Sequence, residues 1–267
     1  MIPDPAADRV ARRKSDLATR TLASVGMIAV AATALWMGDF VFWLLVAIGT
    51  LFMMAEWADL HKVSREHKRL AQFALTVPLA ILSPLAAGAS FLALGLIIGA
   101  AFFVVITTRL PGLARGIVYC GAPALAVVFL RGQDDGLLLA FWAMALVWAC
   151  DIGAYFAGRS IGGPKLAPTI SPNKTWAGLI GGVIAAAVLA GVLQYAGLPL
   201  HLVLATPLLA VLAQMGDLYE SQLKRKAGVK DSGNVLPGHG GVLDRLDGLV
   251  PVAPAAALMV LAGLYLA

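Results

Sequence analysis

The chain has 267 residues, of which 60% are hydrophobic and only 13% are charged, and its net charge is +5. In a typical soluble domain about a quarter of the residues are charged, whereas the mean hydropathy here is +0.85. The composition therefore excludes an ordinary soluble domain and predicts an all-α polytopic membrane protein. Cys120 and Cys150 lie in apolar segments without Cys or His at ligand spacing, which indicates buried thiols rather than a disulfide or a zinc site.

Nine apolar segments are candidates for membrane spans, since a spanning helix needs about 20 apolar residues. They cover residues 21–38, 40–58, 70–87, 90–107, 113–130, 136–158, 175–196, 200–216 and 249–267. Eight or ten spans remain open, because Gly38 and Asp39 could form a kink in one long helix, and Pro78 and Pro84 weaken the third span. The first segment runs on into the second, which fits a retained hairpin better than a cleaved signal peptide.

The basic residues predict which side of the membrane each loop faces. With the N-terminus in the cytoplasm and nine crossings, the C-terminus lies outside, and every Lys and Arg except Arg131 falls on the cytoplasmic side. This bias agrees with the positive-inside rule. The chain then divides into a cytoplasmic tail (residues 1–20), about five N-terminal membrane helices (residues 21–130) and a C-terminal membrane region (residues 131–267) with cytoplasmic loops 159–175 and 217–248.

The sixth apolar segment contains ionisable residues at helical spacing. Asp151, Tyr155 and Arg159 are four residues apart, so they lie on one face of a helix that leads to the cytoplasmic side. Ionisable residues within spans usually mark a functional site. We therefore interpret this face as part of a binding site; the alternative is an Asp–Arg pair that only stabilises helix packing.

The loop after this segment leads into the seventh apolar segment. Ser171, Asn173 or Thr175 can cap the helix that begins there, and the amides at a helix N-terminus attract phosphate groups. Lys174 adds a positive charge at the same place. Capping alone explains the Ser, Asn and Thr side chains. Lys174 favours a phosphate site only when it is considered together with the charged segment that follows the eighth span.

That segment is rich in charged residues and glycine. If the eighth helix continues beyond the membrane surface, Asp217, Ser221 and Lys224 lie on one face; the alternative is a solvated helix end in which Glu220 and Lys224 form an i, i+4 pair. Further along, glycines on both sides of His239 can let backbone N–H groups approach anionic oxygens. His239 itself either contacts a ligand or is an ordinary loop residue.

Acidic and basic side chains occur together in the same segment. The carboxylates can hold a divalent cation and the basic groups can neutralise phosphates. The residues that we single out are the acidic Asp231, Asp244 and Asp247 and the basic Lys224, Arg225, Lys230 and Arg245. This mixture indicates metal-assisted phosphate chemistry.

Residues 140–250 closely resemble the phosphatidate cytidylyltransferases, also called CDP-diacylglycerol synthases. The similarity rests on the pattern Ser221-x-x-Lys224-Arg225, then Lys230-Asp231-x-Gly233, then Pro237-x-His239-Gly240-Gly241-x-x-Asp244-Arg245-x-Asp247. Upstream, Asp151-x-x-Ala154-Tyr155-x-x-Gly158-Arg159 and the segment from Lys165 to Trp176 also resemble the family, as does Gly216-Asp217. One position departs from the pattern: Ala177 stands where family members often carry Glu.

The resemblance implies that CTP and phosphatidic acid react to give CDP-diacylglycerol and pyrophosphate, and that residues 131–267 are the catalytic region. It implies Mg²⁺, leaves open a second, monovalent cation such as K⁺, and suggests a homodimer in the bacterial cytoplasmic membrane with its site facing the cytoplasm. On this basis Asp217 and Asp244 are the first candidates for metal ligands, with Asp247 and Asp231 as second choices. The candidate catalytic residues are Asp217, Lys224, Arg225, Asp244 and Arg245. The candidate substrate-binding residues are Asp151, Tyr155, Arg159, Ser171, Lys174, Ser221, Lys230, His239, Gly240 and Gly241.

Two other function classes compete with an enzyme. A transporter for an anionic solute predicts charged residues and broken helices near the bilayer midplane, often in two inverted halves. Here the charges gather at the predicted cytoplasmic ends of the spans, and no inverted repeat is visible. A non-catalytic membrane scaffold explains the spans but leaves the charged pattern unexplained.

Overall fold

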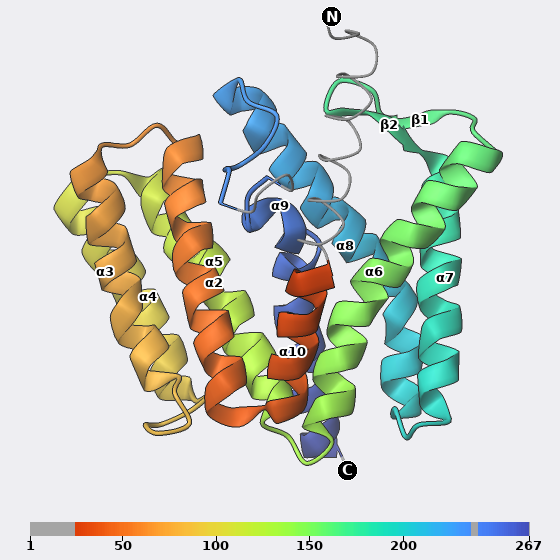
Figure 1. Cartoon of the computed structure of the whole chain (residues 1–267), viewed down its shortest axis with the longest axis horizontal. Helices are drawn as coiled ribbons and strands as arrows, with labels where there is room; N and C mark the ends of the chain where they lie inside the picture. Colours follow the sequence, from red (N-terminus) through yellow and green to blue (C-terminus); the bar gives the residue numbers. More distant parts are fainter. Residues whose placement is uncertain (1–24, 236–239, 267) are drawn as a thin grey trace, which may run out of the picture.

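The computed structural model of the protein describes residues 25–235 and 240–266, so His239 and the predicted tail (residues 1–20) lie outside the described residues. A first helix, Val25–Met37, precedes the elements labelled in Figure 1. These are α2 (Asp39–Leu60), α3 (Arg65–Ile81), α4 (Phe91–Thr108), α5 (Pro111–Arg131), α6 (Gly136–Ser160), β1 (Lys165–Ala167), β2 (Ser171–Thr175), α7 (Trp176–Gln194), α8 (Leu200–Ala227), α9 (Leu243–Leu246) and α10 (Leu249–Leu266).

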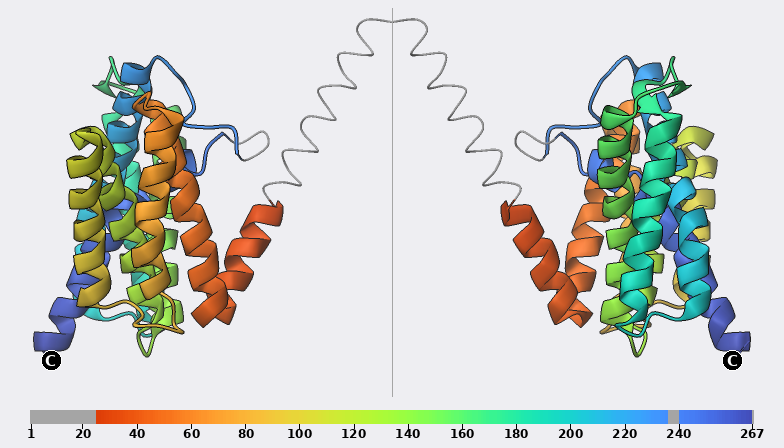
Figure 2. Two further views of the ribbon diagram at one scale, coloured as in Figure 1. Left: turned by 90° about the vertical axis from the view of Figure 1, so that its left-hand side faces the viewer. Right: turned by 90° about the vertical axis from the view of Figure 1, so that its right-hand side faces the viewer.

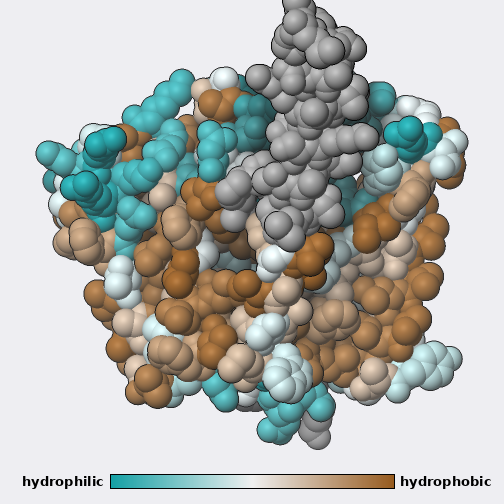
Figure 3. All heavy atoms as spheres, in the orientation of Figure 1, coloured by the Kyte–Doolittle hydropathy of each residue, from teal (hydrophilic) through white to brown (hydrophobic). Residues whose placement is uncertain are grey.

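The protein is a membrane protein built from apolar helices. Six described helices, α2 and α4 to α8, are long and apolar enough to cross a bilayer, and Val25–Met37 and α10 are shorter apolar helices. Large apolar side chains are exposed around the bundle, for example Phe73, Phe91 and Leu204, each more than 70% exposed. Figure 3 shows a hydrophobic band across the middle of one face, with hydrophilic residues gathered mainly at its upper edge and some at its lower edge. Such a band suits contact with lipid tails rather than with water.

The described residues show six helices long and apolar enough to span a membrane and two shorter apolar helices, fewer than the nine spans predicted. The third predicted span (residues 70–87) is one difference. The helix there, α3, begins at Arg65 because the Ser64 side chain accepts a hydrogen bond from the backbone N–H of His67, at 3.3 Å. It ends at Ile81, before a turn that contains Pro84 and Gly88. With 17 residues and a charged first turn, α3 is shorter and more polar than a typical span.

The Gly38 break separates two helices rather than kinking one. Gly38 and Asp39 have φ values of 69° and 40°, and Figure 2 shows the first helix leaning away from α2 at this point. Arg131, the one basic residue predicted outside, donates from Nε to the carbonyl of Leu35 at 2.8 Å and from Nη2 to the carbonyl of Trp36 at 3.2 Å. It therefore satisfies carbonyls that the end of the first helix leaves without partners.

Close packing of α6 against α7 places the polar ends of both helices together. A Cβ atom at Gly153 would lie 2.5 Å from the Cβ of Ala185, and one at Gly182 would lie 2.7 Å from the carbonyl oxygen of Cys150. Small residues at these positions let the two backbones approach, as is common between membrane helices. Cys150 and Cys120 are buried free thiols, as the sequence predicts.

The loop between α6 and α7 contains the β1–β2 hairpin, which the all-α prediction did not include. β1 and β2 pair antiparallel, with Lys165 opposite Thr175 and Ala167 opposite Ser171. Gly162 and Gly163, both with positive φ, end the helical backbone before the hairpin. Thr175 caps α7, since its hydroxyl accepts from the N–H of Gly178 at 3.0 Å. This cap holds the neighbouring Lys174 at the start of α7.

Candidate active site

The polar residues of β2, α8 and the α9 segment form two adjoining clusters. In the first cluster, Lys174 of β2 pairs with Asp217 of α8 at 2.5 Å. The Gln214 side chain accepts from Lys174 at 2.9 Å and donates to Asp151 at 3.2 Å. Ser221, one turn further along α8, donates to Asp217 at 3.3 Å. The structure thus brings Asp151, Lys174, Asp217 and Ser221 together, as the sequence predicts.

The second cluster surrounds Asp244. Lys224 of α8 donates to Oδ1 of Asp244 at 2.7 Å. Oδ2 accepts from the backbone N–H groups of Ser232 and Gly241, both at 2.8 Å, and from the Ser232 hydroxyl at 3.0 Å. Burial raises the pKa of Asp244, but the hydrogen bonds from Lys224, Gly241 and Ser232 outweigh that effect and lower the pKa below its ordinary value. Asp244 is therefore held as a carboxylate in this loop.

Asp247 lies between the two clusters. Burial, and after it the charge of Asp217, raises the pKa of Asp247 to about 7. The backbone at Asp247 packs directly on Gly216, since a Cβ at Gly216 would meet the Asp247 carbonyl oxygen and would lie 2.8 Å from Pro251. Gly216 therefore lets the segment that carries Asp247 approach the turn of α8 that carries Asp217. Two carboxylates that repel one another in this way favour a cation between them.

The carboxylates of the two clusters suit a cation that binds together with substrate phosphates. They suit less well a site in which protein side chains supply every metal ligand. Within residues 25–235 and 240–266 no three His, Cys, Asp or Glu side chains are grouped as ready metal ligands. Mg²⁺ needs only one or two carboxylates when substrate phosphates supply further oxygens. Asp217, Asp244 and Asp247 are the candidates for that role, with Lys174 already paired to Asp217 and Lys224 to Asp244. Asp231 is exposed, and a Cβ at Gly240 would lie 3.5 Å from the Asp231 Cβ.

Several predicted site residues lie outside the two clusters. Tyr155 and Arg159 are exposed, and Arg159 donates to the Tyr155 hydroxyl at 3.2 Å. Arg225 and Lys230 are exposed and form no ion pair with any described residue. Arg245 is exposed on α9. Ser171 begins β2, where it pairs with Ala167 of β1.

The loop that contains Gly240 and Gly241 contacts carboxylates of the protein itself. Gly241 was expected to present its N–H to a phosphate, but this group donates to Asp244. Gly240 has a φ of +83°, which favours glycine, and a Cβ there would lie 2.9 Å from the Asp244 carboxylate. The closeness of Asp244 therefore explains the glycine at position 240, while a Cβ at Gly241 would meet the side chains of Ser232 and Glu56.

Three residues of the clusters were not assigned to the site from the sequence. Glu56 of α2 is 2% exposed and accepts hydrogen bonds from the α9 segment. Gln214 is 4% exposed and joins Lys174 to Asp151. Glu220 is fully buried; its Oε1 lies 3.2 Å from Lys224, and neither oxygen accepts a hydrogen bond from a described residue. The sequence could have indicated Glu56 and Gln214, because an ionisable or amide side chain inside an apolar span often marks a functional site.

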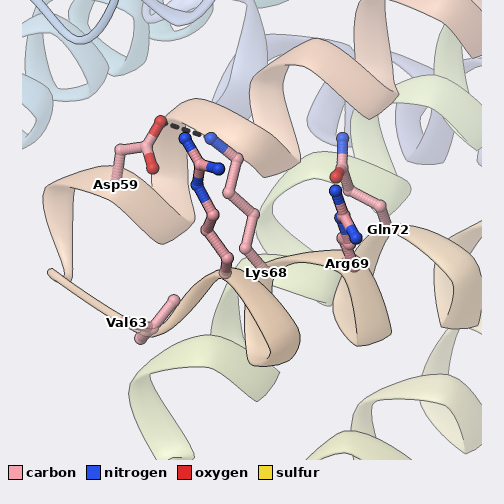
Figure 4. Close-up of a pocket in the computed structure, with 6 residues that line it drawn as sticks. Asp59, Val63, Lys68, Arg69 and Gln72 are labelled. Atoms are coloured by element: carbon pink, nitrogen blue, oxygen red, sulfur yellow. Dashed lines mark hydrogen bonds and ion pairs between the residues drawn. The ribbon is translucent and has the colours of Figure 1, made fainter.

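A pocket elsewhere on the molecule is separate from these clusters. It has a volume of about 410 Å³ and is lined by Asp59, Val63, Arg65, Lys68, Arg69 and Gln72, at the end of α2 and the start of α3 (Figure 4). Lys68 donates to Asp59 across it at 2.6 Å. None of the predicted site residues lines this pocket, so the charged clusters, rather than this cavity, locate the site.

Comparison with known proteins gives matches along nearly the whole chain. A family model described as "Cytidylyltransferase family" matches residues 18–262. A phosphatidate cytidylyltransferase of Brucella suis biovar 1 (strain 1330) is 42% identical over 265 residues, which cover 93% of this chain and 94% of that protein. The phosphatidate cytidylyltransferase of Bacillus subtilis (strain 168) is 49% identical over 142 residues, which cover 51% of this chain and 53% of that protein.

Proposed function

The chain belongs to the cytidylyltransferase family, and on that premise we propose that it is a phosphatidate cytidylyltransferase. It transfers the cytidylyl group of CTP to phosphatidic acid and gives CDP-diacylglycerol and pyrophosphate. The observation that carries the proposal is the pair of lysine–carboxylate contacts, Lys174 with Asp217 and Lys224 with Asp244, at one end of a bundle of apolar helices. A transporter would leave this agreement between family and site unexplained.

The chemistry requires charge neutralisation more than proton transfer. The attacking group is the phosphate monoester of the lipid, whose second pKa is about 6, so it is largely a dianion at neutral pH. An oxygen of this phosphate attacks the α-phosphorus of CTP, the bond to the β-phosphate oxygen breaks, and pyrophosphate leaves with that electron pair. No general base is needed. The barrier is the approach of two anions, which positioned cations lower.

Lys174 and Lys224 are the described cations best placed for this role. Their side chains are 17% and 14% exposed, so their charges are only partly screened by solvent. Each ammonium group is held by a carboxylate rather than by a flexible surface contact, so it keeps its position before substrate binds. We assign these two lysines to the phosphates of CTP and of the lipid. Arg225, Lys230 and Arg245 then act from the exposed side of the site.

We assign the metal to the acidic residues that lie between the lysines. Asp217, Asp247 and Asp244 would hold Mg²⁺ together with phosphate oxygens, and the effect of the Asp217 charge, which raises the pKa of Asp247, supports this choice. When bound, Mg²⁺ polarises the phosphates and neutralises their charge. Removal of the metal with EDTA should stop turnover reversibly, and full activity in excess EDTA would contradict this assignment.

We further propose that the site faces the cytoplasm of a bacterial inner membrane. The α2–α3 loop, the β1–β2 hairpin and the end of α8 lie at the same end of the bundle (Figure 1), and these are the basic loops that the positive-inside rule assigns to the cytoplasm. CTP then reaches the site from the cytosol. The acyl chains of phosphatidic acid stay in the bilayer while its head group enters the site.

A direct assay tests the proposed function. Purified protein in detergent is incubated with phosphatidic acid, radiolabelled CTP and Mg²⁺, and label in the organic phase is measured after extraction. We expect a lipid-soluble product that contains cytidine and requires both phosphatidic acid and Mg²⁺. A folded protein that forms no such product under these conditions would refute the proposal.

A further inference from the structure

We propose that Glu56, far from the charged segments in the sequence, is a positioning residue that holds Asp244 and its loop in the active arrangement. Glu56 lies in α2 and does not touch the two lysines assigned to the phosphates; it acts on the site through hydrogen bonds. The inference rests on the proposed function, because its readout is turnover of CTP and phosphatidic acid. It adds a residue from the N-terminal helices to a site otherwise built from residues 131–267.

Glu56 is an ionisable residue inside an apolar helix, and all its described partners belong to one loop. Its side chain accepts from the N–H of Val242 at 2.9 Å and from the N–H of Leu243 at 2.8 Å. The Ser232 hydroxyl lies 3.0 Å from Glu56 Oε2. A carboxylate that is 2% exposed is costly unless donors surround it. The two backbone N–H groups, with the Ser232 hydroxyl nearby, therefore anchor the start of α9 to α2.

The same donors connect Glu56 to the candidate catalytic carboxylate. The Ser232 hydroxyl lies 3.0 Å from Glu56 and 3.0 Å from Oδ2 of Asp244, so it joins the two carboxylates. A hydroxyl has a single hydrogen to donate, and the backbone N–H of Ser232 gives Asp244 a second donor at 2.8 Å. Leu243, which Glu56 anchors, directly precedes Asp244. Displacement of Glu56 would therefore move Asp244 relative to Lys224.

The glycines of the loop agree with this arrangement. A Cβ atom at Gly233 would lie 2.7 Å from the Glu56 carboxylate, and one at Gly241 would lie 2.5 Å from it. Real Cβ atoms do not approach other atoms so closely, so both positions need glycine as long as Glu56 is in place. Glu56, which lies 177 positions before Gly233 and 185 positions before Gly241, thus explains why both positions are glycine.

The variant Glu56→Gln tests the inference at nearly constant size. The carboxamide NH₂ cannot accept a hydrogen bond, so whichever way the amide turns, Val242 or Leu243 loses its acceptor. Loss of a residue that orients a metal ligand typically lowers metal affinity or activity by about 10- to 100-fold. We expect kcat/KM for CTP to fall in that range and the Mg²⁺ concentration for half-maximal rate to rise about tenfold. A purely structural role would lower the yield of folded protein but leave the Mg²⁺ dependence of the folded fraction unchanged.

Two further variants make the test decisive. Asp59→Asn makes the same charge change in the same helix, at a side chain that pairs with Lys68, and should leave kcat/KM and the Mg²⁺ dependence as in the wild type. Ser232→Ala removes the joining hydroxyl without a change of charge, and should also raise the Mg²⁺ requirement. Combined with Glu56→Gln, it should add little further loss, because both act on one contact.

The outcomes separate this inference from the proposed function. If the wild type makes CDP-diacylglycerol and both Glu56→Gln and Ser232→Ala match it in kcat/KM and Mg²⁺ dependence, the positioning role is wrong while the proposed function stands. If Glu56→Gln does not fold, an unchanged Ser232→Ala overturns the inference by itself. If the folded wild type makes no CDP-diacylglycerol, the proposed function fails, and this role fails with it.

Discussion

Replacement of Lys224 by methionine should affect stability and catalysis by separable amounts. The Lys224 ammonium lies 2.7 Å from Asp244 and 3.2 Å from Glu220, whose side chains are 7% and 0% exposed. Removal of one partner from a buried ion pair costs about 3–5 kcal/mol, because the remaining charge stays buried without compensation. Removal of one group that stabilises developing charge costs about 2.7–4 kcal/mol of transition-state free energy. We therefore expect Lys224→Met to lower both the unfolding temperature and kcat, the latter by about 10²- to 10³-fold.

The double variant Lys224→Met with Glu220→Gln distinguishes the two effects. Glu220→Gln replaces a buried carboxyl group that lies 3.2 Å from Lys224 and accepts no hydrogen bond from a described residue, so the double variant should recover part of the lost stability. It should not recover activity, because the cation assigned to the phosphates is still missing. Stability is measured by thermal unfolding in detergent through tryptophan fluorescence, and activity by the formation of lipid-soluble cytidine product.

Two results would refute this reasoning. Recovery of wild-type kcat in the double variant would mean that Lys224 is needed only as the partner of Glu220. The matched control is Lys226→Met, which removes a positive charge from an exposed position on the same helix end and should change stability by no more than about 0.5 kcal/mol. An equal loss of activity at Lys226 would mean that the lysines act only as a general electrostatic attractor.

Three other predictions concern the metal, the topology and the hairpin. Asp217→Asn should abolish turnover while it leaves expression intact, and activity within a few-fold of wild type would exclude Asp217 as a metal ligand. Cysteines at Lys62 and Lys230 should be protected from an impermeant thiol reagent added to intact cells, whereas a cysteine at Asp134 should be labelled; the two native thiols are buried and should give little background. Labelling at residue 230 from outside would overturn the cytoplasmic site. Thr175→Val removes the cap of α7 and should cost about 1 kcal/mol of stability, with a lower kcat/KM because Lys174 is adjacent, whereas Thr175→Ser should retain both.

Much of the fold follows from local sequence, because a membrane helix is encoded by a continuous apolar run. The predicted segments 136–158 and 175–196 agree closely with α6 and α7. The third segment was misjudged because hydropathy alone does not mark a helix start: the Ser64 cap begins α3 inside a charged stretch. The continuation of α8 to Ala227 was left open by the sequence, since periodicity cannot tell a helix end that is buried against a loop from one in solvent.

The loop that contains Gly240 and Gly241 shows that a correct local inference can still assign the wrong hydrogen-bond acceptor. Glycine at 241 does let a backbone N–H approach an anionic oxygen, as the sequence predicts. That oxygen belongs to Asp244, and the next two amides donate to Glu56. The identity of the acceptor depends on the approach of α2 to the α9 segment, which no spacing within the loop encodes.

The sequence by itself determined the class of protein, the family resemblance and the residues that can carry phosphate chemistry, because hydropathy, charge and motif spacing are local properties. Only the tertiary structure decided how the charges pair: Lys174 with Asp217, Lys224 with Asp244, and Glu56 with the loop before α9. These partners lie 20 to 187 positions apart. Their distances are set by how the helices pack, for example where Gly216 admits the segment that carries Asp247, and that packing is a property of the whole bundle.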